Sequence, residues 1–217
     1  MNRLYLSGGT IIDVERKALF QGDVLIEDGL ISKVLDAGGV LPADANILDV
    51  SGMFISPGFI ESHMHIESSM VPPLEFARAA VPRGTTCALV DPHEITNVFG
   101  EKAIEFFMDQ ADLVPMDMYI GIPSCVPATK LESSGAEITV SHIRRFMGDR
   151  RIYGLAEMMD FPDIIRGDES VRGKVDAVFD FGKIVDGHCP GLSGDALVSY
   201  VRSEERRVGK ECATLCR

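Results

Sequence analysis

The first part of the chain, residues 1–57, consists of short runs in which apolar and polar residues alternate. Residues 4–14 indicate two strands separated by a Gly-Gly pair, and residues 23–35 indicate a hairpin that turns at Asp28 and Gly29. An Asp-Gly pair favours the two-residue turn that joins antiparallel strands. The end of this part adds two more short strands. We therefore expect a small antiparallel β segment rather than a complete domain.

From residue 58 to residue 201 the pattern changes, because short apolar runs alternate with stretches of helical periodicity. Such alternation is typical of βαβ units and a parallel sheet. A (β/α) barrel needs eight strands, and this part offers about five strand–helix units. Periodicity alone leaves a partial barrel and a complete open α/β sheet equally possible. The predicted strands, with the loops that follow them, lie at 58–63, 85–94, 116–128, 151–161 and 183–191, and the predicted helices at 73–84, 98–113, 139–149, 169–182 and 193–201.

The composition is that of a globular protein with an acidic surface. Of the 217 residues, 46% are hydrophobic and 25% are charged, and the formal net charge is −12. Because such a surface repels phosphates, we expect no nucleic acid and no anionic membrane as a partner. There is no apolar run of about 18 residues and no recognisable signal sequence, and the cysteines are sparse and odd in number. We therefore expect reduced thiols and a cytoplasmic location.

The last segment, residues 202–217, differs in composition from the rest of the chain, with five Lys or Arg and three Glu residues. Its start, RSEERRVGKEC, resembles the translation of a sequencing adapter. We expect a non-native tail joined to a truncated reading frame, and we exclude it from the interpretation of the fold. A genuine basic tail is the alternative.

Polar side chains that could bind a ligand follow each predicted strand of residues 58–201. The carboxyl ends of parallel strands meet at one rim, where ligands bind, so we expect these side chains to come together. Among them, we take Glu67, Ser68, Asp91 and Asp186 as candidates for the substrate side of the site. The complete set is His63, His65, Glu67 and Ser68, then Asp91, His93 and Glu94, then Ser124 and Cys125, then Glu157, and finally Asp186, His188 and Cys189.

His63 and His65 stand two residues apart at the end of a predicted strand. Alternate side chains of a strand point to the same face, so both imidazoles can reach one ion. Imidazole suits Zn, Fe and Mn, and a carboxylate such as Glu157 can bridge two ions. His188 would supply a further nitrogen from another strand. His142, in contrast, lies on a predicted amphipathic helix, and we expect it to be solvated.

Other catalytic motifs are absent or incomplete. His65 and Glu67 match the H-x-E part of the zinc nucleobase-deaminase signature, but the P-C-x-x-C part is missing, which excludes that class. The sequence contains no P-loop, no dinucleotide-binding glycine motif and no G-x-S-x-G elbow. Cys125 and Cys189 could act as nucleophiles, although burial is the commoner fate of such residues.

Five segments together resemble bacterial adenine deaminases of the amidohydrolase superfamily. The resemblance implies a (β/α)8 TIM-like barrel with a β domain assembled around it. Residues 58–201 would then supply about five of the eight barrel units, and residues 1–57 part of the β domain. The segments are PGFIESHMHIESSM, RGTTCALVDPHEITNVFG, PSCVPA, GLAEMMDFP and DGHCPGLSG.

The resemblance also implies a binuclear divalent metal centre, with Mn²⁺ or Fe²⁺ favoured and Zn²⁺ possible. His63, His65 and His188 match metal-binding histidines of the family. Glu157 matches the carboxylate that replaces the carboxylated lysine of many superfamily members, and it is both a metal ligand and a catalytic residue in this interpretation. The remaining catalytic candidates, His93 and Glu94, match a motif that lines the site.

The implied reaction is hydrolytic deamination of adenine to hypoxanthine and ammonia by a metal-activated hydroxide, a step of purine salvage, in a homo-oligomer. A further histidine ligand and a catalytic aspartate of the family pattern would follow Val201, so we expect this chain alone to be inactive. One alternative is a related amidohydrolase that acts on a cyclic amide or another aminopurine; a lysine in place of Glu157 would favour cyclic amidases. Another alternative is a non-catalytic partial barrel.

Overall fold

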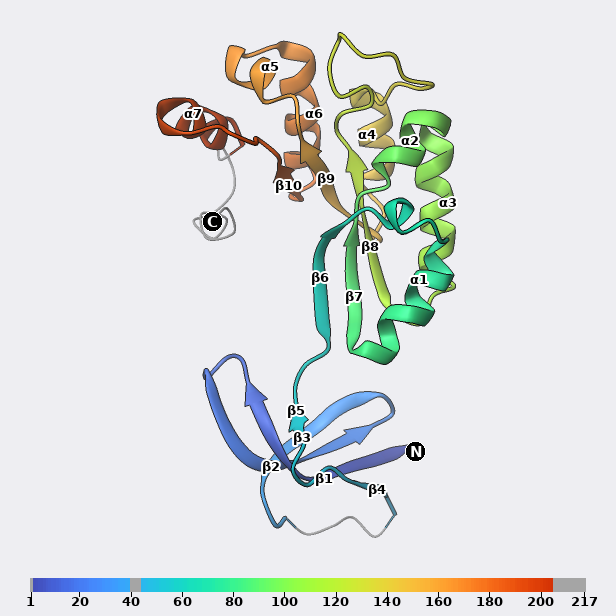
Figure 1. The fold of residues 1–217 in the computed structure, drawn as a ribbon, viewed down its shortest axis with the longest axis vertical. Coiled ribbons are helices and arrows are strands. Elements are labelled where there is room, and N and C mark those ends of the chain that lie inside the picture. Colours follow the sequence, from blue (N-terminus) through green and yellow to red (C-terminus); the bar gives the residue numbers. More distant parts are fainter. Residues whose placement is uncertain (1, 40–43, 205–217) are drawn as a thin grey trace. The chain divides into compact units, whose positions relative to one another are not determined.

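The computed structural model describes residues 2–39 and 44–204 (Figure 1). It divides the chain into two compact units, Met1–Gly58 and Phe59–Arg217, each with its own sheet. Most of the predicted non-native tail, residues 205–217, lies outside the described residues, so that interpretation stays a prediction. Within the described ranges, none of the helices has both the length and the apolar composition that crossing a membrane requires.

The first unit is a mixed sheet with the strand order β3-β2-β1-β4, in which β5 also pairs with β1. The hairpin at Asp28 and Gly29 is confirmed, and both residues have the positive φ angles, 51° and 84°, that a tight turn of this kind requires. β4 and β5 run parallel to β1, which differs from the antiparallel arrangement expected throughout. The reason is that neither follows its partner through a tight turn, so no hairpin sets its direction. The strands are β1 (Arg3–Asp13), β2 (Ala18–Glu27), β3 (Leu30–Asp36), β4 (Asn46–Asp49) and β5 (Phe54–Ile55).

Strand β1 is continuous, whereas the sequence indicated two strands around its Gly-Gly pair. The pairing with β2 shifts register between Leu6 and Gly9, so the glycines form an irregularity inside one strand. Gly8 has a φ of 78°, and its N–H donates a hydrogen bond to the Asp23 carboxylate at 2.7 Å. The Tyr5 hydroxyl donates to the same carboxylate at 2.9 Å. Asp23 is thus a buried acid with its partners in place.

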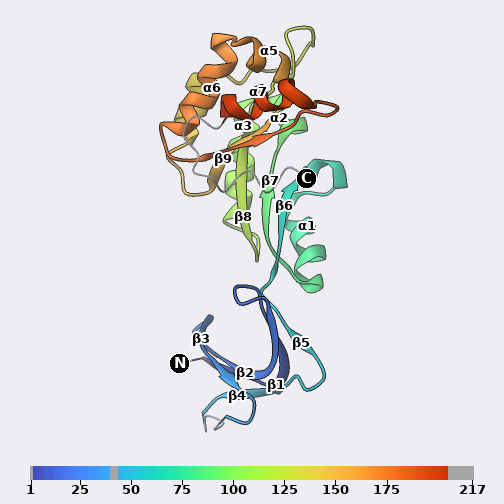
Figure 2. The same ribbon diagram turned by 90° about the vertical axis from the view of Figure 1, so that its left-hand side faces the viewer.

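The second unit is a parallel sheet with the strand order β10-β9-β8-β7-β6. The strands lie side by side in the same order as they occur in the chain. A doubly wound sheet would instead reverse its strand order at a switch point. The sheet is therefore part of a barrel. This settles the choice that periodicity left open. The helices α1 (Pro73–Ala80), α2 (His93–Phe99) and α3 (Glu101–Ala111) lie to the right of the strands in Figure 1, and Figure 2 shows the same ribbon turned by 90°. The strands are β6 (Phe59–Met64), β7 (Thr85–Val90), β8 (Asp117–Pro123), β9 (Ile152–Met158) and β10 (Ile184–Gly187).

The helices agree with the predicted ones except in two places. The expected helix over 98–113 is two helices that meet at Gly100, whose φ of 59° and ψ of −137° interrupt the helical backbone. α5 occupies a stretch, after residue 161, to which the sequence analysis assigned no element. The Asp160 side chain caps it by accepting from the N–H of Asp163. The α-helices are α1 (Pro73–Ala80), α2 (His93–Phe99), α3 (Glu101–Ala111), α4 (Val140–Phe146), α5 (Phe161–Arg166), α6 (Glu169–Phe179) and α7 (Gly194–Glu204), and the 3₁₀ turns are η1 (Ile66–Ser69) and η2 (Val81–Arg83).

His142 has a structural role that the sequence interpretation missed. Its Nδ1 accepts a hydrogen bond from the N–H of Thr139 at 3.1 Å, and the Thr139 side chain accepts from the N–H of His142. The two residues therefore form a reciprocal cap at the start of α4. His142, expected only to be solvated, is half-buried and takes part in this cap.

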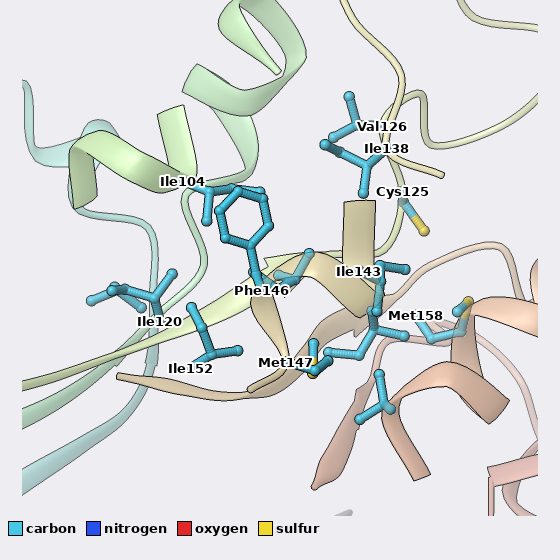
Figure 3. Packing of buried hydrophobic residues seen from close by; sticks show 14 of the residues in the cluster. Ile104, Ile120, Cys125, Val126, Ile138, Ile143, Phe146, Met147, Ile152 and Met158 are labelled. Atoms are coloured by element: carbon cyan, nitrogen blue, oxygen red, sulfur yellow. The ribbon is translucent and has the colours of Figure 1, made fainter. Parts of the chain in front are cut away.

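The core of the second unit lies between the sheet and its helices. Figure 3 shows Ile120 and Ile152 of neighbouring strands beside Ile104, Ile143 and Phe146 of the helices. These side chains are buried, and their removal from water is the main force that holds the helices on the sheet. The rigid layer that results fixes the strand ends, from which the polar side chains project.

Strand β10 approaches β9 very closely at one glycine. A Cβ atom at Gly154 would stand 1.9 Å from the carbonyl oxygen of Ile184. Only glycine leaves room for this approach. Since β10 leads to Asp186 and His188, this glycine helps to set where those residues lie.

Candidate metal centre

His63 and His65 lie at the end of β6 and bring their Nε2 atoms to 3.3 Å from each other. Nδ1 of His65 lies 2.9 Å from the carbonyl oxygen of Asp91, which can only accept, so this nitrogen donates. Nδ1 of His63 lies 3.0 Å from a carboxylate oxygen of Asp186 and donates in the same way. Both rings are thereby oriented with an Nε2 lone pair toward the site, the arrangement usual for histidines that bind metals.

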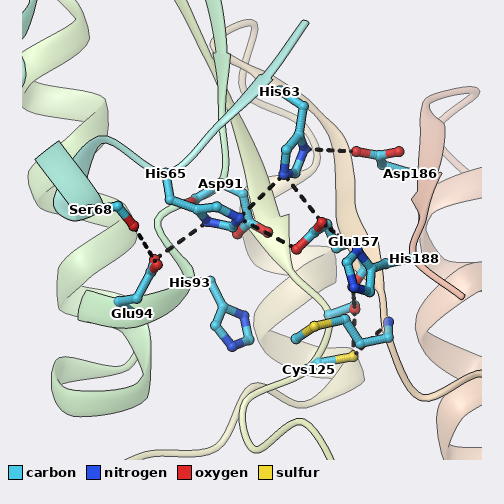
Figure 4. Close-up of polar contacts among 12 residues, drawn as sticks. His63, His65, Ser68, Asp91, His93, Glu94, Cys125, Glu157, Asp186 and His188 are labelled. Atoms are coloured by element: carbon cyan, nitrogen blue, oxygen red, sulfur yellow. Dashed lines mark hydrogen bonds and ion pairs between the residues drawn. The ribbon is translucent and has the colours of Figure 1, made fainter. Parts of the chain in front are cut away.

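Glu157, at the end of β9, lies between the histidines (Figure 4). Its two carboxylate oxygens are 3.3 Å from Nε2 of His63 and 3.5 Å from Nε2 of His65. The side chain is 12% exposed. The donor atoms of these three residues all lie within 4.8 Å of one another. The structure thus brings three of the four predicted ligands into one cluster.

His188 follows β10. Among the described contacts, it meets the cluster only through Glu157. Its Nδ1 lies 2.8 Å from Oε1 of Glu157. The imidazole is 43% exposed, more than the other two rings. Glu157 therefore connects His188 to the pair of histidines on β6, as a bridging carboxylate would.

Asp91 directly follows β7, contacts His65 through its backbone carbonyl, and is 1% exposed. Neither of its carboxylate oxygens has a hydrogen-bond partner among the described residues. Burial, followed by the negative charge of Glu157, raises the pKa of Asp91 well above its ordinary value. A buried acid without donors beside another carboxylate is costly unless a positive charge is close.

This arrangement fits a divalent transition metal. Two Nε2 lone pairs and the oxygens of Glu157 face one another, and the nearby Asp91 carboxylate has no hydrogen-bond partner among the described residues. Neutral imidazole and carboxylate oxygen together suit Mn, Fe and Zn. All of these atoms are acceptors, so they cannot form hydrogen bonds with one another. A cation bound between them would interact with all of them.

Glu94, His93, Ser68 and Glu67 lie on the β6 and β7 side of the cluster. Glu94 accepts from the Ser68 hydroxyl at 3.1 Å, and its other oxygen is 3.4 Å from Nδ1 of His65. Burial lowers the pKa of His93, whose ring centroid is 6.5 Å from that of His65. Burial raises the pKa of Glu67, which accepts a long hydrogen bond from the N–H of Ile95. Its other carboxylate oxygen has no partner within the described ranges.

Ser124 and Cys125, which follow β8, do not join the cluster of donors. The Ser124 hydroxyl donates to the carbonyl of Glu157 at 2.5 Å, and the Cys125 sulfur accepts from the N–H of Met159 at 3.2 Å. Cys125 is 2% exposed, and burial raises the pKa of its thiol. A nucleophilic role for this cysteine is disfavoured, since the thiolate is the reactive form. Cys189 is half-buried against the core.

Two tyrosines near the site were missed by the sequence interpretation. Tyr153 lies on β9, and its hydroxyl is buried with no partner in the described part of the chain. Tyr200 lies on α7 and bonds to the backbone beside Glu157 and at His188. The other site residues were found because they follow the carboxyl ends of predicted strands. Tyr153 lies near the start of β9 and Tyr200 lies on a helix, so that rule does not select them.

Comparison with known proteins places the chain in a family. Residues 54–211 match the sequence model of the amidohydrolase family. An adenine deaminase of Halalkalibacterium halodurans is 43% identical over 91% of this chain and 33% of its own length. An adenine deaminase of Geobacillus kaustophilus is 39% identical over 97% of this chain and 36% of its own length. The chain thus spans about a third of the length of these curated relatives.

Solved structures share the fold at low sequence identity. N-isopropylammelide isopropylaminohydrolase from Burkholderia multivorans has a TM-score of 0.61 at 16% identity, over 94% of this chain and 57% of that one. A D-hydantoinase has a TM-score of 0.58 at 17% identity, over 86% of this chain and 40% of that one. The barrel-like arrangement of the second unit is therefore shared with these hydrolases.

Proposed function

The chain belongs to the amidohydrolase family, and from this we propose that its parent protein is an adenine deaminase. The reaction would convert adenine and water to hypoxanthine and ammonia. Relatives that carry this name are 39–43% identical to the chain, which supports the choice of substrate. The observation that carries the proposal is the cluster of His63, His65 and Glu157 at the rim of the sheet. We expect the chain of 217 residues by itself to show little turnover.

The metal centre is part of the proposal. His63, His65, Glu157 and His188 would hold a pair of divalent ions, and Mn²⁺ or Fe²⁺ is our first expectation, with Zn²⁺ the alternative. When bound, such ions supply the Lewis acidity that brings the pKa of a water molecule near neutrality. The Asp91 carbonyl and the Asp186 carboxylate hold the two β6 imidazoles in the tautomer that leaves Nε2 free.

The chain's own residues would bind adenine and move protons. In the reaction, a water oxygen bonds to C6 of the ring, the bond from C6 to the exocyclic nitrogen breaks, and ammonia leaves. We propose that Glu94 takes a proton from water and passes it to the exocyclic nitrogen, which leaves as ammonia, while the second proton of the water stays on the product. The carboxylate of Glu94 is half-exposed and contacts His65. His93, whose pKa is lowered by burial, would meet the substrate as a neutral hydrogen-bonding group. Glu67, Ser68, Asp91 and Asp186 remain proposed residues of the substrate side.

The test is an assay of the purified parent protein with adenine and Mn²⁺, in which hypoxanthine and ammonia are both measured. Equal amounts of the two products are expected, and Glu157→Gln should abolish them. Absence of hypoxanthine from the metal-replete protein would contradict the proposal. Turnover of a cyclic amide or of another aminopurine in the same assay would instead favour a related hydrolase, and a stable protein that binds no metal would favour a non-catalytic barrel.

We also propose that the parent protein is a cytoplasmic homo-oligomer that acts on a small molecule. The net charge of −12 is unfavourable for binding nucleic acids or anionic membranes. Measurement of the molecular mass in solution and of binding to DNA at low salt tests this view. A monomer, or affinity for DNA, would contradict it.

A further inference from the structure

The hydroxyl of Tyr200 joins the ends of two neighbouring strands. It donates a hydrogen bond to the carbonyl oxygen of Met158 at 2.7 Å and accepts one from the N–H of His188 at 3.0 Å. Met158 follows Glu157 directly in the chain. One phenol oxygen therefore contacts the backbone beside Glu157 and at His188, two of the proposed metal ligands.

The strand pairing alone holds this region loosely. β10 is four residues long, and among the described residues it pairs only with β9. The pairing shifts register between Val185 and Gly187, directly before His188. The hydrogen bond from the N–H of His188 to Tyr200 therefore adds a constraint, from outside the sheet, on the residue that follows the strand.

The position of Tyr200 suits it to fixing His188 beside β9. The residue lies on α7 and is 2% exposed, and its ring meets that of Phe161 edge to face at 6.5 Å between centroids. The packing holds the ring, and the hydroxyl then has a defined place. A phenylalanine would keep the packing and lose both hydrogen bonds, so the two contributions can be separated.

The backbone around Glu157 is also held by a second set of side-chain contacts. The Ser124 hydroxyl donates to the Glu157 carbonyl, and the carbonyl of Ser124 accepts from the ammonium group of Lys174 at 2.7 Å. Burial lowers the pKa of Lys174. These contacts hold Glu157, but none of them reaches His188. Of these three side chains, only that of Tyr200 bonds both to the backbone next to Glu157 and to the backbone of His188.

We propose that Tyr200 is a positioning residue of the metal centre, whose hydroxyl sets the separation of Glu157 and His188. The inference rests on the proposed metal centre and adds to it a residue on a helix. Groups that orient metal ligands commonly change metal affinity by about 10- to 100-fold when they are removed. Loss of the hydroxyl should therefore weaken binding of the ion that His188 holds while leaving the fold in place.

The experiment compares Tyr200→Phe with the unaltered parent protein and with Ser199→Ala. Ser199 is the neighbour of Tyr200 on α7, and its hydroxyl bonds only to the carbonyl of Asp195 among the contacts described. Mn²⁺ is titrated into metal-free protein, and free Mn²⁺ is measured by electron paramagnetic resonance. We expect about 10-fold or greater weakening for Tyr200→Phe and no change for Ser199→Ala. Binding by Tyr200→Phe within about twofold of the unaltered protein would overturn the inference.

A second measurement uses the unaltered protein and covers the case in which Tyr200→Phe does not fold. The amide of His188 should exchange slowly with deuterium in the metal-free protein because it donates to Tyr200. Exchange as fast as in a solvated loop would overturn the inference. If the unaltered protein binds no Mn²⁺, the proposed function fails, whereas slow exchange at His188 would still support the bond from Tyr200.

Discussion

Oε1 of Glu157 lies 2.8 Å from Nδ1 of His188, so that a carboxylate at the end of β9 meets an imidazole just beyond the end of β10. The same carboxylate reaches both histidines of β6, on the far edge of the sheet. Curvature of the sheet brings these strand ends together, as it does in a barrel. Glu157 is therefore the side chain on which the candidate centre depends most.

Replacing Glu157 by glutamine should remove metal binding without unfolding the protein. The amide has the shape of the carboxylate but lacks its charge, and it can no longer bridge two ions. We expect Mn²⁺ affinity to fall about 100-fold or more, together with loss of the proposed activity. Metal content is measured after dialysis, with Glu75→Gln on the exposed side of α1 as the control. Full metal content in Glu157→Gln would show that the cluster is not the metal site.

Replacing Gly154 by alanine should separate β10 from β9. A Cβ would stand 1.9 Å from the carbonyl oxygen of Ile184. This oxygen belongs to the backbone of β10, so relieving the clash requires the strand itself to move. We expect a loss of about 3 kcal/mol in the free energy of unfolding, measured with urea. Gly148→Ala is the matched control, because a Cβ there meets nothing within 4 Å. Equal stability of the two variants would contradict the predicted crowding.

Asp149 should stabilise the second unit in a pH-dependent way. Its hydrogen bonds with the Arg151 side chain lower the pKa of Asp149 from 3.8 to about 2. A lowered pKa in the folded state means that the contribution is complete above the unfolded value and is lost as the pH falls toward 2. Because both side chains are partly exposed, we expect Asp149→Asn to cost about 1 kcal/mol at pH 7.

The pH dependence of that variant provides the check. The difference in unfolding free energy between Asp149→Asn and the unaltered protein should shrink as the pH falls from about 4 to about 2. Asp176→Asn on the exposed side of α6 is the control and should show no such change. A difference that stays constant over this range would rule out the ion pair as its cause.

Two tyrosine-to-phenylalanine variants should behave in opposite ways. Tyr5 donates to the buried carboxylate of Asp23, so its loss removes a hydrogen bond to a charged group, and we expect a cost of about 1–3 kcal/mol. The hydroxyl of Tyr153 is buried without a partner in the described part of the chain, so its loss should be neutral or stabilising by up to about 1 kcal/mol. Urea unfolding of both variants tests this. An equal loss of unfolding free energy in the two variants would contradict the view that only the Tyr5 hydroxyl has a hydrogen-bond partner among the described residues.

The Asp23 carboxylate provides a further readout for Tyr5→Phe. Burial alone would raise the pKa of Asp23, but hydrogen bonds from Gly8, Tyr5 and two later backbone N–H groups outweigh it, and the pKa is lowered. Removal of the Tyr5 hydroxyl should therefore raise the pKa of Asp23 in the folded state, measured by carboxyl NMR. An unchanged titration would mean that the hydroxyl does not bond to it in solution.

Much of the candidate site could be predicted from local patterns. The spacing of His63 and His65, together with strand periodicity, places two imidazoles on one face, and the rule that parallel strand ends converge adds Glu157 and His188. The same local reasoning could not assign His142 to a helix cap, since its partner is the backbone of Thr139. Nor could it place α5, because a six-residue helix is too short to show periodicity.

The sequence by itself determined the alternation of strands and helices, the hairpin at Asp28 and Gly29, and the metal-binding residue types at the strand ends. These depend on interactions within a few residues, which leave a pattern along the chain. Only the tertiary structure decided that strand order follows chain order and that Tyr200 connects Met158 with His188. It also decided that the buried carboxylate of Asp91 has no hydrogen-bond partner among the described residues. Such relations are distances between segments far apart in the sequence, and packing of the whole unit sets them.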